Sequence, residues 1–147
     1  MDRYGTVKRL KNEELELGYR TSALERRGLF AVRAAFSLTT GDPDAIRAKM
    51  EELAAKRKEK QPLEYPSAGS TFKRPEGYFA GKLIEDAGLK GFSVGGAAVS
   101  EKHAGFVINK DHGTAADILE LCNEVKRRVK ENSGVDLEME VKLLGDF

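Results

Sequence analysis

The sequence predicts an α+β fold, in which about three helices pack on a small mixed sheet. Two segments carry apolar residues at helical spacing, and each begins with residues that favour a helix N-terminus. Residues 135–144 alternate between apolar and polar side chains, and residues 91–109 contain short apolar runs separated by glycines, as strands do. The predicted order is strand, helix, loop, helix, strands, helix, strand.

Two strands and one helix are expected in the first part of the chain. Residues 6–10 suit a short edge strand, and residues 29–38 (LFAVRAAFSL) suit a largely buried strand. A helix then begins at Asp42-Pro43. It ends in the cationic run KRKEK before Pro62, which blocks continuation. Its apolar face consists of Ile46, Met50, Leu53 and Ala54.

The second part of the chain predicts the remaining elements. A short helix lies within residues 77–91 and stops near Gly88, and residues 91–109 form two or three short strands. A long helix begins at Thr114 with a capping-box pattern and ends at Ser133-Gly134. Its apolar stripe is Ala115, Ile118, Leu119, Cys122, Val125 and Val129. In the final strand, Val135, Leu137, Met139 and Val141 share one face, opposite Glu138 and Glu140.

Composition limits the function classes. The 147 residues fit one medium domain, or one domain with an appended fragment. The net charge of +1 argues against a general nucleic-acid or membrane binder, and no apolar run approaches a membrane span. A single cysteine, Cys122, excludes an internal disulfide and indicates a reducing compartment. No metal site is expected, because the spacing of His103 and His112 does not suit zinc.

Residues 65–75 (YPSAGSTFKRP) form the loop whose side chains are best suited to ligand binding or catalysis. Gly69 permits a close backbone approach, and the Ser70 hydroxyl next to Lys73 and Arg74 would suit an anionic ligand beside a proton donor. Taken alone, this composition favours a capped turn. Glu140 is similarly open to two interpretations: an exposed polar face, or a carboxylate held over a site by a rigid strand.

Five blocks in order resemble one family. They are GYRTS, KQPLEYPSAGSTFKRP, AGKLIEDAGLKG, GGAAVSEKHAGFVIN and LEMEV. Together they look like the second half of the UDP-N-acetylenolpyruvoylglucosamine reductase family, flavoenzymes that complete UDP-N-acetylmuramate for bacterial peptidoglycan. The resemblance runs from about Gly18 to the C-terminus and implies a cytoplasmic enzyme.

The resemblance also implies roles for individual residues. FAD, reduced by NADPH, would pass a hydride to the enolpyruvyl double bond of UDP-N-acetylglucosamine enolpyruvate. Ser70 would be the general acid, and Arg20 and Glu140 would stabilise the developing enolate. Glu140 could do so only if it is protonated or bridged to a cation. The residues expected to contact the substrate are Tyr19, Lys60, Arg74, Lys90 and His103.

The chain also departs from the family pattern. It lacks the extra tyrosine loop of the longer branch, so it resembles the shorter branch, and Arg74 stands where the longer branch has asparagine. Residues 1–40 are expected to be a remnant of the FAD-binding domain, and residues 41–147 the substrate-binding C-terminal domain. With the flavin-binding half missing, we expect the chain alone to be inactive and to bind FAD weakly or not at all. The alternative is a non-catalytic module that binds a nucleotide sugar.

Overall fold

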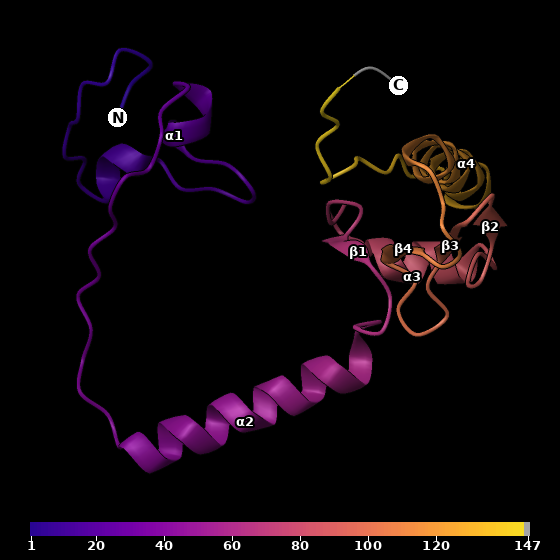
Figure 1. The fold of residues 1–147 in the computed structure, drawn as a ribbon, viewed down its shortest axis with the longest axis horizontal. Coiled ribbons are helices and arrows are strands. Elements are labelled where there is room, and N and C mark those ends of the chain that lie inside the picture. The colour runs from indigo at the N-terminus through magenta and orange to yellow at the C-terminus, as the bar shows by residue number, and fades with distance from the viewer. Residues whose placement is uncertain (146–147) are drawn as a thin grey trace. The chain divides into compact units, whose positions relative to one another are not determined.

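A computed structural model describes residues 1–145 of the chain. These residues belong to two compact units, one of them Met1–Asp42 and the other beginning at Pro43. Figure 1 shows the elements of both units by colour and label. Each unit is described here by itself.

The first unit contains little regular structure. Its elements are a 3-10 helix, η1 (Glu13–Leu15), and a single helical turn, α1 (Ala23–Arg26). Both Arg26 and Arg27 pair with the Glu16 carboxylate, which lies between these two elements, and the Arg26 hydrogen bond is the main reason that the Glu16 pKa is lowered. Ala23 is buried.

The two strands predicted in this unit are wrong. Residues 6–10 and 29–38 have no regular structure, and the apolar side chains of Phe30, Val32, Phe36 and Leu38 are 59% to 86% exposed. A strand requires a partner for its backbone groups. Within residues 1–42 the structure contains no strand that could provide one.

The second unit begins with helix α2 (Pro43–Lys60), which confirms the predicted helix. None of its residues is buried, and its apolar residues Ile46, Met50 and Leu53 are 51% to 66% exposed. Lys49 and Lys56 both pair with Glu52 on the helix surface. Pairs at this spacing support a helix that has few tertiary contacts.

A four-stranded sheet forms the centre of the second unit. Its strands are β1 (Ser67–Ser70), β2 (Ser93–Val94), β3 (Ala97–Val99) and β4 (Phe106–Asn109), in the order β1-β4-β3-β2. Two or three short strands were predicted within residues 91–109, and the structure has three there, β2, β3 and β4. All three pairings are antiparallel, whereas a mixed sheet was expected. Strand β1 lies where a loop was expected.

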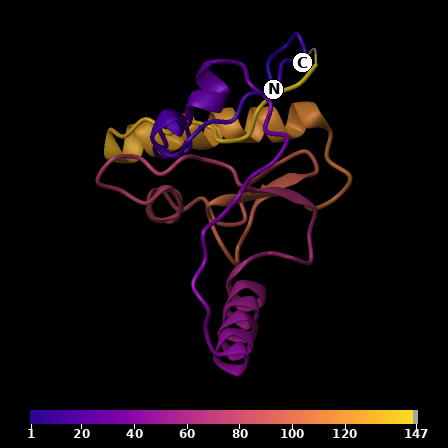
Figure 2. The same cartoon turned by 90° about the vertical axis from the view of Figure 1, so that its left-hand side faces the viewer.

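Two helices complete the core. They are α3 (Ala80–Asp86) and α4 (Ala115–Ser133), which runs beside the sheet in Figure 2. Helix α4 has the predicted capping box between Thr114 and Asp117, and it ends at Gly134. Its buried residues are Leu121, Cys122, Val125 and Val129. Leu121 was not part of the predicted stripe, while Ala115 of that stripe is exposed.

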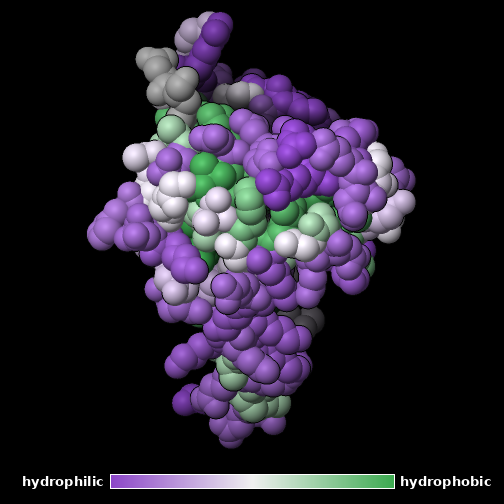
Figure 3. Space-filling model, turned by 90° about the vertical axis from the view of Figure 1, so that its right-hand side faces the viewer, coloured by the Kyte–Doolittle hydropathy of each residue, from purple (hydrophilic) through white to green (hydrophobic). Residues whose placement is uncertain are grey.

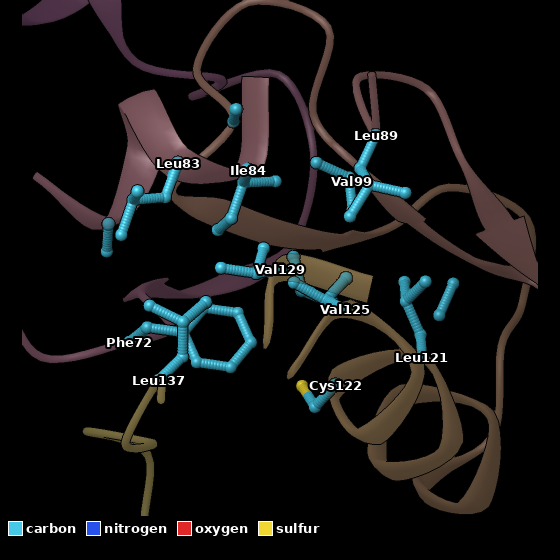
Figure 4. Packing of buried hydrophobic residues seen from close by; sticks show 14 residues of the cluster. Phe72, Leu83, Ile84, Leu89, Val99, Leu121, Cys122, Val125, Val129 and Leu137 are labelled. Carbon is cyan, nitrogen blue, oxygen red and sulfur yellow. The ribbon is translucent and has the colours of Figure 1, made fainter. Parts of the chain in front are cut away.

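Residues 135–141 run beside the core without forming a regular strand. A single bridge joins Met139 to Phe72, so the predicted final strand is reduced to one backbone pairing. The predicted face is correct, because Leu137 is buried and Met139 packs against the core. Figure 4 shows Phe72 and Leu137 side by side within this core. The α+β class is therefore confirmed.

Candidate functional site

Ser70 occupies the last position of β1, where the strand departs from regular pairing. It lies opposite Phe106 of β4, but the register shifts between Ser67 and Ser70. Gly69 lies within this irregularity with a φ of 86°, a conformation that side-chain-bearing residues rarely adopt. The irregularity turns the chain at Gly69 and leaves Ser70 exposed.

A hollow of about 450 Å³ lies beside Ser70. Arg57 contributes the one charged side chain of its lining, and Tyr65 and Phe106 contribute aromatic rings. The full lining is Arg57, Gln61, Pro62, Leu63, Tyr65, Pro66, Ser67, Gly69, Ser70 and Phe106. A hydroxyl and a cation at an open hollow suit an anionic ligand.

The segment that follows Ser70 pairs with the segment that carries Glu140. The Lys73 backbone N–H donates to the Glu138 carbonyl at 2.8 Å, and the Glu140 N–H donates to the Thr71 carbonyl at 2.9 Å. The structure therefore brings the chain around Ser70 next to the segment that carries Glu140. Glu140 is half-buried and is not among the residues that line the hollow.

Tyr19 and Arg20 lie in the first unit, at the tip of a tight turn. Gly18 and Thr21 exchange backbone hydrogen bonds across this turn, at 3.1 and 3.4 Å. Arg20 has a φ of 54°, and its guanidinium lies 5.8 Å from the centre of the Tyr19 ring. Such a backbone is strained for arginine and is found at functional sites more often than elsewhere. That Tyr19 and Arg20 converge with Ser70 at one site remains a prediction.

Two of the predicted substrate-binding cations are exposed and already have partners. Arg74 lies 3.9 Å from the centre of the Phe79 ring, and its Nε donates to the Tyr78 carbonyl at 3.2 Å. Lys90 pairs with Glu85 at 2.8 Å, which lowers the pKa of the Glu85 carboxyl. Lys60, the third cation, is exposed at the end of α2.

His103 is half-buried and held by the backbone around it. Its Nδ1 accepts a hydrogen bond from the Gly105 N–H at 3.1 Å, so in the neutral ring the proton lies on Nε2. The ring meets the edge of Phe106, which lines the hollow, with 4.9 Å between the ring centres. His103 can therefore offer an Nε2–H donor near the hollow.

A family model describes most of the second unit. The C-terminal domain of UDP-N-acetylenolpyruvoylglucosamine reductase matches residues 61–144. The chain belongs to this family. Within the matched region lie Ser70, Arg74, Lys90, His103 and Glu140, whereas Tyr19, Arg20 and Lys60 lie before it.

Relatives named UDP-N-acetylenolpyruvoylglucosamine reductase are similar over nearly the whole chain. Those from Clostridium beijerinckii and Geobacillus kaustophilus are both 58% identical, over 95% and 97% of this chain. The reductase of Thermus caldophilus, a crystal structure, is 38% identical with a TM-score of 0.72 over 88% of this chain. The chain covers 46% to 47% of the length of these proteins, so it spans about half of them.

Arg57, Gln61 and Tyr65 are members of the site that sequence reasoning missed. The Arg57 Nε donates to Gln61 Oε1 at 3.0 Å, so the two side chains share one wall of the hollow. The available signal was the cationic KRKEK run at the end of α2, which contains Arg57 but does not single it out. Among the residues described, no group of His, Cys, Asp and Glu could hold a metal ion, and no helix combines the length and apolarity of a bilayer crossing.

Proposed function

We propose that this chain supplies the substrate-binding and catalytic C-terminal portion of a flavin-dependent reductase. The reaction converts UDP-N-acetylglucosamine enolpyruvate to UDP-N-acetylmuramate in the bacterial cytoplasm, with NADPH as the reductant. The observation that carries the proposal is the pairing of residues 71–73 with residues 138–140, which joins the Ser70 and Glu140 segments within a family-matched domain.

The site fits a flavin reaction in which the protein supplies the proton. When bound, FAD supplies the hydride for the enolpyruvyl double bond, and we assign its binding mainly to the N-terminal half found in the longer relatives. Around Ser70 the chain leaves room, because a side chain placed at Gly69 would meet no atom within 4 Å. An exposed hydroxyl on an open strand end can reach a substrate that lies against a planar ring.

Each site residue then has one task. Ser70 gives its hydroxyl proton to the carbon that does not receive the hydride. Arg20 and Glu140 stabilise the charge that develops on the carboxylate side, with Glu140 protonated or bridged to a cation. Lys60, Arg74 and Lys90 bind the diphosphate and carboxylate, while Tyr19 and the His103 Nε2–H are assigned to contacts with the substrate.

A chimera tests this proposal. The chain replaces the matching C-terminal portion of the Geobacillus kaustophilus reductase, which is 58% identical to it over 142 residues. NADPH oxidation that depends on UDP-N-acetylglucosamine enolpyruvate is then measured with the native Ser70 and with Ser70→Ala. Loss of a positioned general acid should lower kcat by about 10²- to 10⁴-fold and change KM only a few-fold. Ser93→Ala, an exposed serine of β2, is the matched control.

The alternative is a module that binds a nucleotide sugar without a redox step. It predicts that a chimera with an intact flavin shows no substrate-dependent turnover while the chain still binds UDP-N-acetylglucosamine in calorimetry. Equal loss of binding and turnover on Ser70→Ala would also contradict a general-acid role.

A further inference from the structure

An ion pair joins the two segments that carry Ser70 and Glu140. The Lys73 Nζ pairs with Glu138 Oε1, and the two residues are 65 positions apart in the sequence. The same two residues share the backbone hydrogen bond of 2.8 Å from the Lys73 N–H to the Glu138 carbonyl. Lys73 therefore holds Glu138 by both its main chain and its side chain.

The backbone pairing around this ion pair is short. Two backbone hydrogen bonds flank the bridge between Phe72 and Met139. Pairings of this length are marginal by themselves and open easily unless side chains hold them. On one face, Phe72 is buried at 4% exposure and Met139 packs against the core. Because side chains alternate, Lys73 and Glu138 hold the opposite face.

Lys73 could pair with more than one acid of the segment that carries Glu140, so it matters which acid it binds. Asp136, Glu138 and Glu140 recur at every second position, so all three share one face of an extended segment. A slip of two residues would keep apolar side chains on the core face and would bring a different acid opposite Lys73. When Lys73 pairs with Glu138, Glu140 lies opposite Thr71, the residue that follows Ser70.

We propose that Lys73 and Glu138 are positioning residues for the catalytic pair Ser70 and Glu140, an inference that rests on the proposed function. Neither residue needs to touch the substrate. Their pairing fixes which carboxylate lies beside the Ser70 segment, and a displacement of about 1 Å in such an arrangement can cost as much as 10²-fold in rate.

The first measurement does not depend on activity. Amide hydrogen exchange of the 147-residue chain follows the Glu140 N–H, which donates to Thr71 across the pairing. Lys73→Met should speed this exchange about threefold, as suits an exposed ion pair. Glu138→Gln should do the same, and the double variant should exchange no faster than either single variant. Lys82→Met, which removes the exposed Lys82–Asp86 pair of α3, is the matched control and should leave the Glu140 exchange unchanged.

The second measurement uses the chimera. Lys73→Met and Glu138→Gln should each lower kcat about fivefold or more, with KM for the nucleotide sugar within twofold and Tm close to that of Lys82→Met. Unchanged exchange of the Glu140 N–H would overturn the positioning role, whatever the activity. Faster exchange with kcat equal to that of Lys82→Met would overturn it as well. Failure of the proposed function is distinct, because it would appear as a chimera without substrate-dependent turnover, or as full turnover by Ser70→Ala.

Discussion

At the scale of single residues, Gly96 is the most tightly enclosed glycine of the β2–β3 turn. Its carbonyl accepts hydrogen bonds from the Lys110 and Asp111 N–H groups, at 2.9 and 3.0 Å. A Cβ at this position would lie 2.1 Å from the Asp111 carbonyl oxygen and 2.3 Å from the Gly113 nitrogen. Both obstacles are backbone atoms, so no side-chain rotation could relieve the clash.

We therefore expect Gly96→Ala to lower the free energy of unfolding by about 3 kcal/mol or more, as overpacking against backbone does. Urea denaturation of the chain measures this loss. Gly77→Ala is the control, because a Cβ there meets no atom within 4 Å and only the positive φ of 75° opposes it. It should cost about 1 to 2 kcal/mol. A Gly96→Ala variant as stable as Gly77→Ala would show that the loop yields.

The sequence was informative about residues only where a motif identified them. Ser70 and Glu140 belong to family blocks, so both could be named as candidates for one site although 70 positions separate them. Arg57 belongs to no such block, and the four cations of the KRKEK run differ mainly in the direction in which the helix turns them. Which cation lines the hollow depends on how the end of α2 lies against the segment from Pro62 to Ser70, and that is a tertiary property.

At the scale of elements, α4 contributes more residues to the main apolar cluster than any other helix or strand. Leu121, Cys122, Val125 and Val129 are each fully buried, and with Phe72 and Leu137 they belong to one apolar cluster. Figure 3 shows a band of apolar surface across the middle of one face, bordered by hydrophilic side chains. Charged residues cover the outer side of the helix.

Truncating a buried side chain of α4 should lower the free energy of unfolding. We expect Leu121→Ala to reduce the free energy of unfolding by about 2 to 5 kcal/mol, because it removes buried methyl groups and leaves a cavity. Leu144→Ala changes a side chain that is 88% exposed and should alter stability by less than about 0.5 kcal/mol. Thermal or urea unfolding followed by circular dichroism compares the two, and equal stability would contradict the described core.

The charged side chains on the outer side of α4 should make the stability of the protein depend on pH. Hydrogen bonds from Arg127, and then from Arg128, lower the Glu124 pKa from 4.5 to about 2. A lowered pKa adds stability that is complete above the unfolded value and is lost as pH falls toward about 2. Glu124→Gln should therefore lower Tm by about 1 to 2 °C at pH 7 and by nothing below pH 2. A difference that persists unchanged at pH 2 would contradict the assignment.

Helix α4 was predictable because all its determinants are local. Thr114, Asp117 and Gly134 mark its ends, and apolar residues recur along one side. Residues 29–38 have an equally strong strand composition, but a strand is completed by hydrogen bonds to a neighbour, which local composition cannot supply. For the same reason Ser67–Ser70, rich in serine and glycine, becomes a strand only because β4 offers an edge.

At the scale of the whole molecule, the two units should separate under proteolysis. Residues 27–42 are exposed apart from the half-buried Leu29, and they contain no helix or strand. Brief trypsin treatment should cut first in this segment, with Arg33 as its most central basic residue, and leave the β1–α4 core intact. Mass spectrometry of the early fragments identifies the sites. First cuts between residues 80 and 130 would contradict the described core.

The rate at which Cys122 is chemically labelled should measure how fast the folded core opens. It is the single thiol of the chain, its side chain is fully buried, and burial raises its pKa to about 11. The thiolate is the nucleophile that attacks a thiol reagent, and burial both disfavours the thiolate and keeps the reagent away, so labelling must wait until α4 separates from the sheet. At saturating reagent, the rate of labelling equals the rate of that opening. One natural atom thus reports how often the core opens, without a probe having to be introduced.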